Sequence, residues 1–431
     1  MKYVNISAQT MENYFEEIRQ LNDDIRARFE KLERRIRKNE VIAGFYEGIY
    51  NDILSDDNYY QSPLHMVDSN GELITVTPEI NVRLAKYKKH CRVSQDSVKE
   101  CSRHFVVDYY RLQGVKDIKK KTSCNNKFCD ACQSAISQQR YEKFAPVLEI
   151  LQENFDIAHI VFTIPNCHKS ELQCAIDKMY EARQAVIRYL TGSKKIRGID
   201  FERFGYRGGI SSLEVTRNEE TGKFHPHFHC AFVFAQKSGV FGRKTHINKY
   251  SYDYGEKVRY FNDFEILLQK VWRLKIDGLE VNRHSIENLP LGYDVIVEYR
   301  KNFKEIFKYT TKGALKYDKD VSRVLGLYSD FMYLDWALYQ RRVMQTYGCM
   351  RGIPVTEEVE QKAGEEDTKY QELIARLKSI EEPEEQIEFL ENLQSEENRQ
   401  NIKYISCHNM KAVINAEDAE EWELPTTRKG K

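Results

Sequence analysis

Three histidines alternate along one short segment, a spacing suited to metal binding. In FHPHFHCAFVF, residues 224–234, His225, His227 and His229 are each separated by one residue. Because alternate side chains of a β-strand share a face, the imidazoles lie on one side and the aromatic rings on the other. The preceding segment, residues 208–217, also alternates, and the polar sequence NEETGK joins the two. This pattern predicts a β-hairpin.

The hairpin predicts a site with three metal ligands. If the polar faces of its two strands coincide, Glu214 lies beside His227 and His229. Two imidazoles and a carboxylate suit a divalent ion such as Mn²⁺ or Mg²⁺, and Zn²⁺ less exclusively. Three protein ligands leave positions open, which a catalytic metal needs to polarise a substrate oxygen. The alternative is a polar strand whose histidines only face water.

A second set of reactive side chains falls on residues 302–316, NFKEIFKYTTKGALK. Helical spacing places Glu305, Tyr309 and Lys312 on one stripe. A tyrosine hydroxyl can act as a covalent nucleophile, a lysine can supply positive charge, and a glutamate can act as a general base. Ordinary surface helices carry the same residue types, so only the combination with the histidine hairpin indicates chemistry.

A cysteine cluster predicts a second metal site. The sequence CNNKFCDAC contains Cys124, Cys129 and Cys132, and its C-x2-C half is typical of structural zinc sites. A fourth ligand is needed, and four nearby residues could supply it: Cys91, Cys101, His90 and His104. Several lysines around the cluster are suited to contact phosphates: Lys119, Lys120, Lys121 and Lys127.

The elements that must position these residues can be read from the apolar pattern. Short alternating or β-branched runs predict strands at 157–165 and 293–300. Periodic apolar positions predict helices at 10–55, 168–192 and 327–347. Strands and helices alternate irregularly, which indicates an α+β fold with a largely antiparallel sheet.

The charge of the chain is balanced in total but not along its length. The 431 residues include 66 basic and 66 acidic side chains. Residues 1–80 carry a net charge of −6, residues 81–355 carry +16 and residues 356–431 carry −10. A basic central region between acidic flanks indicates a polyanionic partner.

Three further features limit the classes of protein to which this sequence could belong. No apolar run reaches the length of a membrane span, and the N-terminus lacks the apolar core of a secretory signal. Ten cysteines in such a chain indicate a reducing compartment, where clustered cysteines bind metal rather than form disulfides.

The order of three motifs resembles a known family. VFTIPN, SLEVTRNEETGKFHPHFHCAFVF and EIFKYTTKG occur in the same order in rolling-circle replication initiators (Rep proteins) of small Gram-positive plasmids, members of the HUH endonuclease superfamily. HPHFH is similar to that family's His-hydrophobic-His motif, and Tyr309 and Lys312 are similar to its Tyr-x-x-Lys motif. Glu305 resembles the glutamate of the single-tyrosine subgroup. The resemblance covers roughly residues 86–355.

The resemblance implies a fold and a mechanism. The fold is an HUH domain with a central antiparallel sheet of ferredoxin or RRM-like topology flanked by helices, with a small zinc-binding element and helical flanks. A metal on His227, His229 and Glu214 would polarise the scissile phosphate of single-stranded origin DNA. Tyr309 would attack it to form a 5′-phosphotyrosine and a 3′-OH primer, and Glu305 would activate water at termination, when the strands are rejoined.

The resemblance also implies ligands and partners. Similar initiators carry a cysteine about two dozen residues before the zinc cluster, which favours Cys101 as the fourth ligand. The expected partners are origin DNA, single-stranded or in a cruciform, and the host helicase and polymerase, in the bacterial cytoplasm and without a membrane. A homodimer is compatible with this interpretation. The alternatives are a zinc-ribbon HUH transposase and a non-catalytic zinc-dependent DNA-binding regulator.

The motifs and charges divide the chain into four expected regions. These are an acidic helical N-terminal region, a basic cysteine-rich zinc-binding region, the HUH nicking and joining domain, and an acidic C-terminal tail, helical or partly disordered; they cover residues 1–85, 86–145, 146–355 and 356–431.

Overall fold

The computed structural model describes most of the chain between residues 23 and 393. The described residues are 23–56, 59–61, 64, 71–74, 77–101, 105–110, 115–121, 123–244, 249–252, 257–292, 294–299, 302–307, 321–353, 355 and 364–393. Tyr309 and Lys312 therefore lie outside the described residues, and Glu305 lies inside them.

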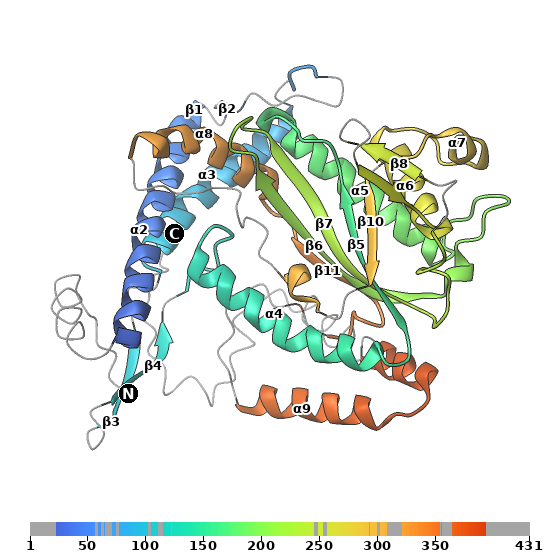
Figure 1. Ribbon diagram of the computed structural model, residues 1–431. Coiled ribbons are helices and arrows are strands. Elements are labelled where there is room, and N and C mark those ends of the chain that lie inside the picture. The colour runs from blue at the N-terminus through green and yellow to red at the C-terminus, as the bar shows by residue number, and fades with distance from the viewer. Residues whose placement is uncertain are drawn as a thin grey trace.

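A five-stranded antiparallel sheet forms the centre of the molecule (Figure 1). Its strand order is β10-β5-β7-β6-β11. The bounds are β5 Asp156–Thr163, β6 Tyr206–Arg217, β7 Phe224–Phe234, β10 Val295–Tyr299 and β11 Met344–Gly348. Helix α5 (Leu172–Leu190) links β5 to β6, and α6 (Asp263–Ile276) and α7 (Arg283–Asn288) lie between β7 and β10. Each helix-linked pair of strands encloses one antiparallel strand, which is the split βαβ arrangement.

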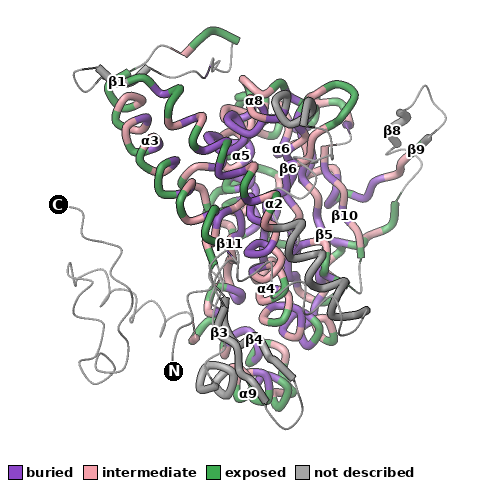
Figure 2. Tube along the Cα trace, turned by 90° about the vertical axis from the view of Figure 1, so that its left-hand side faces the viewer, coloured by how far each residue is buried: buried purple, intermediate pink, exposed green. Residues whose placement is uncertain are grey.

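Helices cover both faces of the sheet. Apolar side chains of one face pack against α5 and α6 and, further out, against α2 (Asp23–Asp52), α3 (Pro78–Lys99) and α8 (Val321–Leu338). The other face packs against α4 (Asp130–Leu151), the short 3₁₀ helix η3 (Lys304–Phe307), α9 (Gly364–Ser379) and the helical residues 383–393. The central strands β5, β6 and β7 are accordingly largely buried, whereas α3 exposes one side to solvent (Figure 2). None of the described helices is long and apolar enough to cross a membrane.

Short elements complete the described chain. Three two-stranded sheets pair β1 with β2, β3 with β4 and β8 with β9. Their bounds are Leu54–Asp56, Tyr59–Gln61, Phe105–Tyr110, Val115–Lys121, Lys249–Tyr252 and Lys257–Tyr260. Two further 3₁₀ helices are η1 (Lys169–Glu171) and η2 (Glu202–Phe204).

The predicted hairpin is formed by β6 and β7, and its turn sets the register. Asn218 and Lys223 close the turn by a backbone hydrogen bond of 2.9 Å, and the Asn218 side chain accepts from two amides within it. Gly222 adopts a left-handed conformation with φ of 67°, which favours glycine. Because a slip of one residue would turn every side chain to the other face, this turn determines which residues meet across the strands.

The predicted strands and the helix at 168–192 are confirmed, but the helix predicted at 327–347 is wrong in its second half. Helix α8 ends at Leu338, and residues Met344–Gly348 form β11 instead. Gln340 has φ of 58°, which interrupts the helix. Pairing with β6 then satisfies the backbone of β11, a long-range effect that local periodicity does not contain.

A buried polar network joins the N-terminal helices to α8. The hydroxyls of Tyr46 and Tyr87 donate to the two carboxylate oxygens of Asp335, at 2.9 and 2.7 Å. The side-chain amide of Asn126 donates to the Tyr46 hydroxyl at 2.9 Å. Burial and the neighbouring Asp335 raise the pKa of both tyrosines well above their ordinary value, so both hydroxyls remain donors.

We expect Asp335→Ala to destabilise the protein by about 2–6 kcal/mol, because two buried hydroxyls lose their acceptor and each unsatisfied hydroxyl costs roughly 1–3 kcal/mol. Urea unfolding followed by circular dichroism measures the change. Asp263→Ala, at an exposed position, is the matched control. A change below about 1 kcal/mol in Asp335→Ala would show that the network does not stabilise the packing of α2 and α3 on α8.

Candidate active site and metal centres

Glu214, His227 and His229 meet on one face of the sheet. Glu214 on β6 lies directly opposite His227 on β7, and Ser212 lies opposite His229. The Nε2 atoms of the two histidines are 3.1 and 3.0 Å from the same carboxylate oxygen, Glu214 Oε2. The expectation that the polar faces of the hairpin coincide is therefore confirmed.

The geometry of this group fits a divalent ion. Two ligand atoms about 2.1 Å from a metal and at right angles to each other are about 3 Å apart, which matches both distances to Glu214. The Nδ1 atom of His227 faces the backbone oxygen of His225 at 3.2 Å, so Nε2 is left for the site. Burial tends to raise the pKa of Glu214, but hydrogen bonds from the two imidazoles lower it to about 2. The carboxylate is thus ionised at neutral pH, as a metal ligand must be.

His225 shares this face but has a different environment. Its Nε2 atom contacts the hydroxyl of Thr163 on β5 rather than Glu214. Burial, helped by the nearby His227, lowers the pKa of His225, which keeps its ring neutral. Its ring stacks on that of His227, with centroids 5.1 Å apart.

His159 is a further residue of the site that was not predicted from the sequence. This residue is buried on β5, and its Nε2 atom lies 3.2 Å from Nδ1 of His229, the nitrogen that faces away from Glu214. The two rings are parallel, with centroids 5.4 Å apart and 5° between their planes. Partners of this kind hold a metal-binding histidine in one orientation. The available signal was a histidine within an otherwise apolar strand, IAHIVFT.

We expect His159→Phe to weaken Mn²⁺ binding about 10- to 100-fold, because the ring is replaced but the hydrogen bond that orients His229 is lost. Isothermal titration with Mn²⁺ measures the affinity. His284→Phe, at an exposed position on α7, is the matched control. Unchanged Mn²⁺ affinity in His159→Phe would mean that packing alone orients His229.

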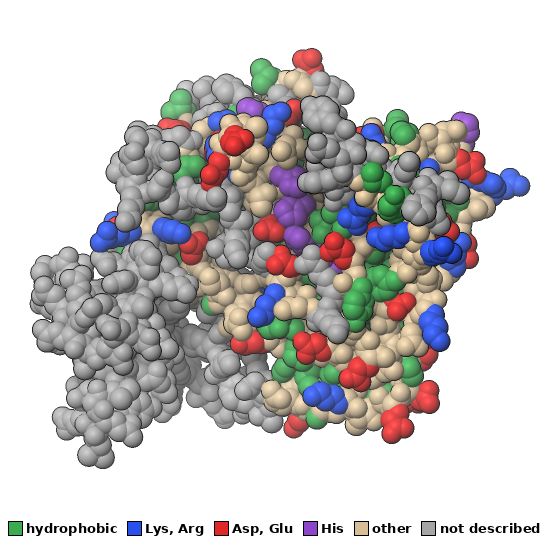
Figure 3. All heavy atoms as spheres, in the orientation of Figure 1, with side chains coloured by type: hydrophobic (Ala, Val, Ile, Leu, Met, Phe, Trp, Pro, Cys, Tyr) green, Lys and Arg blue, Asp and Glu red, His purple; other side chains and the backbone are tan. Residues whose placement is uncertain are grey.

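The histidine face is open to the surface next to a helical wall. Histidine side chains gather at the centre of the face in Figure 3, beside acidic side chains. Further along the same face, Ala231 and Val233 of β7 pack with Ile306 and Phe307 of η3. The ring of Phe307 stacks on Phe144 of α4, with centroids 5.9 Å apart.

Glu305 lies on this wall, partly exposed. Of the predicted apolar stripe, Phe303, Ile306 and Phe307 are buried as expected. Phe307 is the last described residue of this segment, and it packs on the sheet face that carries the histidines.

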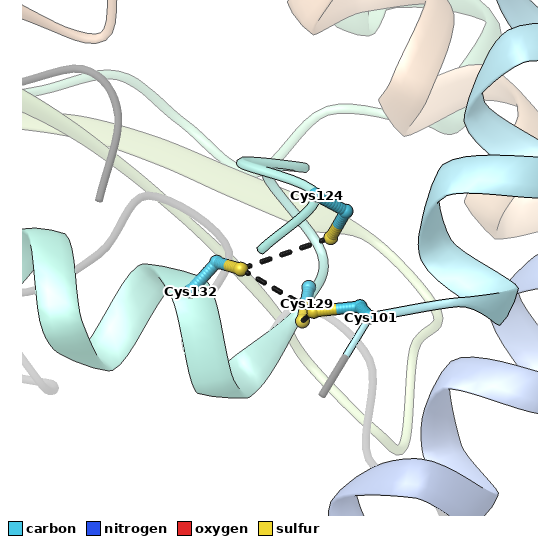
Figure 4. A group of neighbouring side chains, drawn as sticks. All are labelled: Cys101, Cys124, Cys129 and Cys132. Carbon is cyan, nitrogen blue, oxygen red and sulfur yellow. Dashed lines mark hydrogen bonds between the residues drawn. The ribbon is translucent and has the colours of Figure 1, made fainter. Parts of the chain in front are cut away.

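The four cysteines predicted to bind zinc come together (Figure 4). Cys101 follows α3, Cys124 lies in a loop, Cys129 caps the start of α4 and Cys132 lies in its first turn. Neighbouring sulfurs are 3.5 to 3.8 Å apart. Sulfurs about 2.3 Å from a tetrahedral zinc are about 3.8 Å from one another, whereas a disulfide would need about 2 Å. The spacing fits a tetrahedral metal.

Of the candidates for the fourth position, the structure brings Cys101 to the cluster. His90 and Cys91 lie on α3 and pack instead against Tyr46 and Tyr87, with the ring of His90 next to both tyrosines. His104 lies outside the described residues.

Comparison with known proteins assigns the family. Residues 115–401, about two thirds of the chain, match the replication protein family, Rep_1. The chain belongs to this family. Its likeness to a curated protein is distant: it is 24% identical over 186 residues to "Protein rep" of Staphylococcus aureus, which covers 42% of this chain and 76% of that protein. No solved structure matches the chain.

Proposed function

We propose that this Rep-family chain is a plasmid rolling-circle replication initiator that nicks single-stranded origin DNA with Tyr309. The observation that carries the proposal is the convergence of Glu214, His227 and His229 on one sheet face, next to η3. Tyr309 follows Phe307 by two residues, a reach of at most about 7 Å. The split βαβ order of the sheet and the family membership are consistent with an HUH domain.

In the proposed reaction the three ligands would hold Mn²⁺ or Mg²⁺. The bound ion would withdraw charge from a non-bridging oxygen of the scissile phosphate. Glu214 and the two Nε2 atoms define where that phosphate lies, and His159 keeps His229 in place. The Tyr309 oxygen forms a bond to phosphorus while the bond from phosphorus to the 3′ oxygen breaks. The products are a 5′-phosphotyrosine and a 3′-OH end.

Two further residues have proposed roles in this cycle. Lys312 would place its ammonium near the developing negative charge on the phenolic oxygen or the phosphate. Glu305 would accept a proton from water at termination and so allow a second cleavage before the strands are rejoined. Glu305 is partly exposed on η3, and its neighbours Ile306 and Phe307 pack with Ala231 and Val233 of β7, which supports this role.

We propose that Cys101, Cys124, Cys129 and Cys132 hold a structural Zn²⁺, because four ligands leave no open position for chemistry. The proposed partners are origin DNA and the host helicase and polymerase that extend the 3′-OH primer, in the cytoplasm of a bacterium. A homodimer on a double-stranded origin would fit these partners.

Mapping the covalent adduct tests the proposed function. The protein is incubated with a supercoiled origin plasmid and Mn²⁺, the DNA and protein are digested, and the nucleotide-bearing peptide is sequenced by mass spectrometry. We expect a 5′-phosphotyrosyl bond at Tyr309. An adduct on two tyrosines would favour a transposase. Specific DNA binding without nicking in Mn²⁺ or Mg²⁺ would favour a non-catalytic regulator.

A further inference from the structure

A pocket of about 510 Å³ opens at the end of the sheet that carries the histidines. Apolar side chains of Ile164, Pro165 and Ile276 line part of it. Polar groups of Asn166, Arg273, Asp277 and Asp294 line another part, and Arg273 Nε lies 3.9 Å from Asp277 Oδ2. Its volume lies within the range of pockets that bind small organic groups, and its polar side chains could orient such a group.

The pocket adjoins the metal site through His225. His225 and Thr163 belong to its wall, and the His225 ring stacks on His227 with centroids 5.1 Å apart. A DNA strand whose phosphate lies at Glu214, His227 and His229 would therefore have an adjacent nucleotide at the mouth of the pocket.

Hydrogen bonds between neighbouring segments hold the pocket walls in place. The Thr163 amide donates to the Asp294 carbonyl at 2.9 Å, and Trp272 Nε1 donates to the Thr163 carbonyl at 2.8 Å. The Gly292 amide donates to the side chain of Gln269 at 2.8 Å. The ends of β5, α6 and the loop before β10 are thus fixed to one another, so little ordering would be needed on binding.

The carboxylate of Asp294 is incompletely compensated. Within the described part of the chain, its Oδ2 atom is screened from solvent and has no hydrogen-bond partner. Burial raises the pKa of Asp294. The positive charge of nearby Arg273 acts in the opposite direction, but the pKa stays above its ordinary value. A Cβ added at Gly292 would be 2.7 Å from Asp294 Oδ2 and 3.0 Å from Arg273 Nη1. The Arg273 guanidinium and the Asp294 carboxylate therefore both border the space beside Gly292. A buried acceptor without a partner is costly unless a ligand supplies a donor.

We propose that this pocket receives one base of the DNA strand next to the nicked phosphate, and that Asp294 accepts a hydrogen bond from an N–H group of that base. The inference rests on the proposed function for the position of the strand. The apolar walls suit the faces of a base, and a carboxylate disfavours a phosphate. Guanine presents two adjacent N–H donors on its pairing edge, which a carboxylate accepts together, so guanine is the expected occupant.

Binding of labelled oligonucleotides tests this pocket. The probes are fluorescein-labelled dT15 and the same strand with one central dG, dA or dC, and the full chain is used without divalent ions so that no cleavage occurs. We expect the dG strand to bind at least about fivefold tighter than dT15, as for a specific base contact. In Asp294→Asn this preference falls below about twofold, while affinity for dT15 stays within about twofold, because backbone contacts are unchanged.

Two variants sharpen the test. Gly292→Ala places a methyl group against Asp294 Oδ2 and Arg273 and should also reduce the preference. Asp263→Asn, an exposed aspartate on α6, should keep it, with an unchanged melting temperature in all three proteins. Equal preference in Asp294→Asn and the unaltered protein, or no base preference at all, overturns the inference. Loss of nicking with the base preference intact would overturn only the proposed function.

Discussion

Tyr309→Phe is expected to reduce nicking of a supercoiled origin plasmid at least about 1,000-fold and to abolish the covalent protein–DNA adduct. Phenylalanine keeps the aromatic ring but lacks the oxygen that would form the bond to phosphorus. The affinity for single-stranded DNA should stay within about twofold, because phosphate contacts do not depend on this hydroxyl. Gel assays of nicking in Mn²⁺, detergent-resistant adduct and anisotropy measure the three quantities.

The matched control is Tyr299→Phe. Tyr299 is exposed at the end of β10, on the edge of the sheet, so its hydroxyl should not affect nicking. If Tyr309→Phe still forms the adduct, the nucleophile is another residue. If both variants lose nicking equally, loss of the tyrosine hydroxyl acts indirectly and the assignment of Tyr309 fails.

Cys101→Ser is expected to release the metal of the cysteine cluster and to lower the stability of the protein. Without the fourth thiolate, the affinity for zinc, measured by competition with a chelator, should fall at least about 100-fold, because structural sites depend on all four ligands. The cluster joins α3 to α4, and Lys127 within its loop donates to the Arg341 carbonyl at 2.9 Å, just before β11. The melting temperature should therefore fall, and nicking should fall with it.

Cys174→Ser is the control for Cys101→Ser, since Cys174 lies on α5 outside the cluster. Zinc content by elemental analysis and the melting temperature distinguish the two variants. One zinc per chain in Cys101→Ser, with unchanged stability, would show that Cys101 is not a ligand. A zinc-free unaltered protein with the same stability would show that the cluster does not need a metal.

The hairpin and its ligands could be predicted because their signals are local. Alternation along 224–234 separates histidines from aromatic rings within one strand, and a six-residue turn determines the partner of each residue. The same holds for Cys129 and Cys132, which one helical turn brings together. Side-chain periodicity and turn chemistry operate over a few residues, so a single sequence contains them.

Contacts between distant segments could not be derived in this way. The local apolar periodicity of residues 344–348 indicated a helix. These residues form β11 instead, because their backbone pairs with β6, more than 120 residues earlier in the chain. The orientation of His229 depends on His159 from another strand, which a lone histidine in an apolar run does not reveal.

The sequence by itself determined the ligand types, the hairpin register and the order of the reactive motifs. Residue spacing alone left Cys101, His90 and Cys91 open as the fourth member of the cysteine cluster. The tertiary structure brings Cys101 there, as the family resemblance favoured, because this depends on where α3 ends relative to α4. It also decided that His225 faces Thr163 and a pocket instead of Glu214. Each of these outcomes depends on how separate elements pack, and packing is a property of the whole chain.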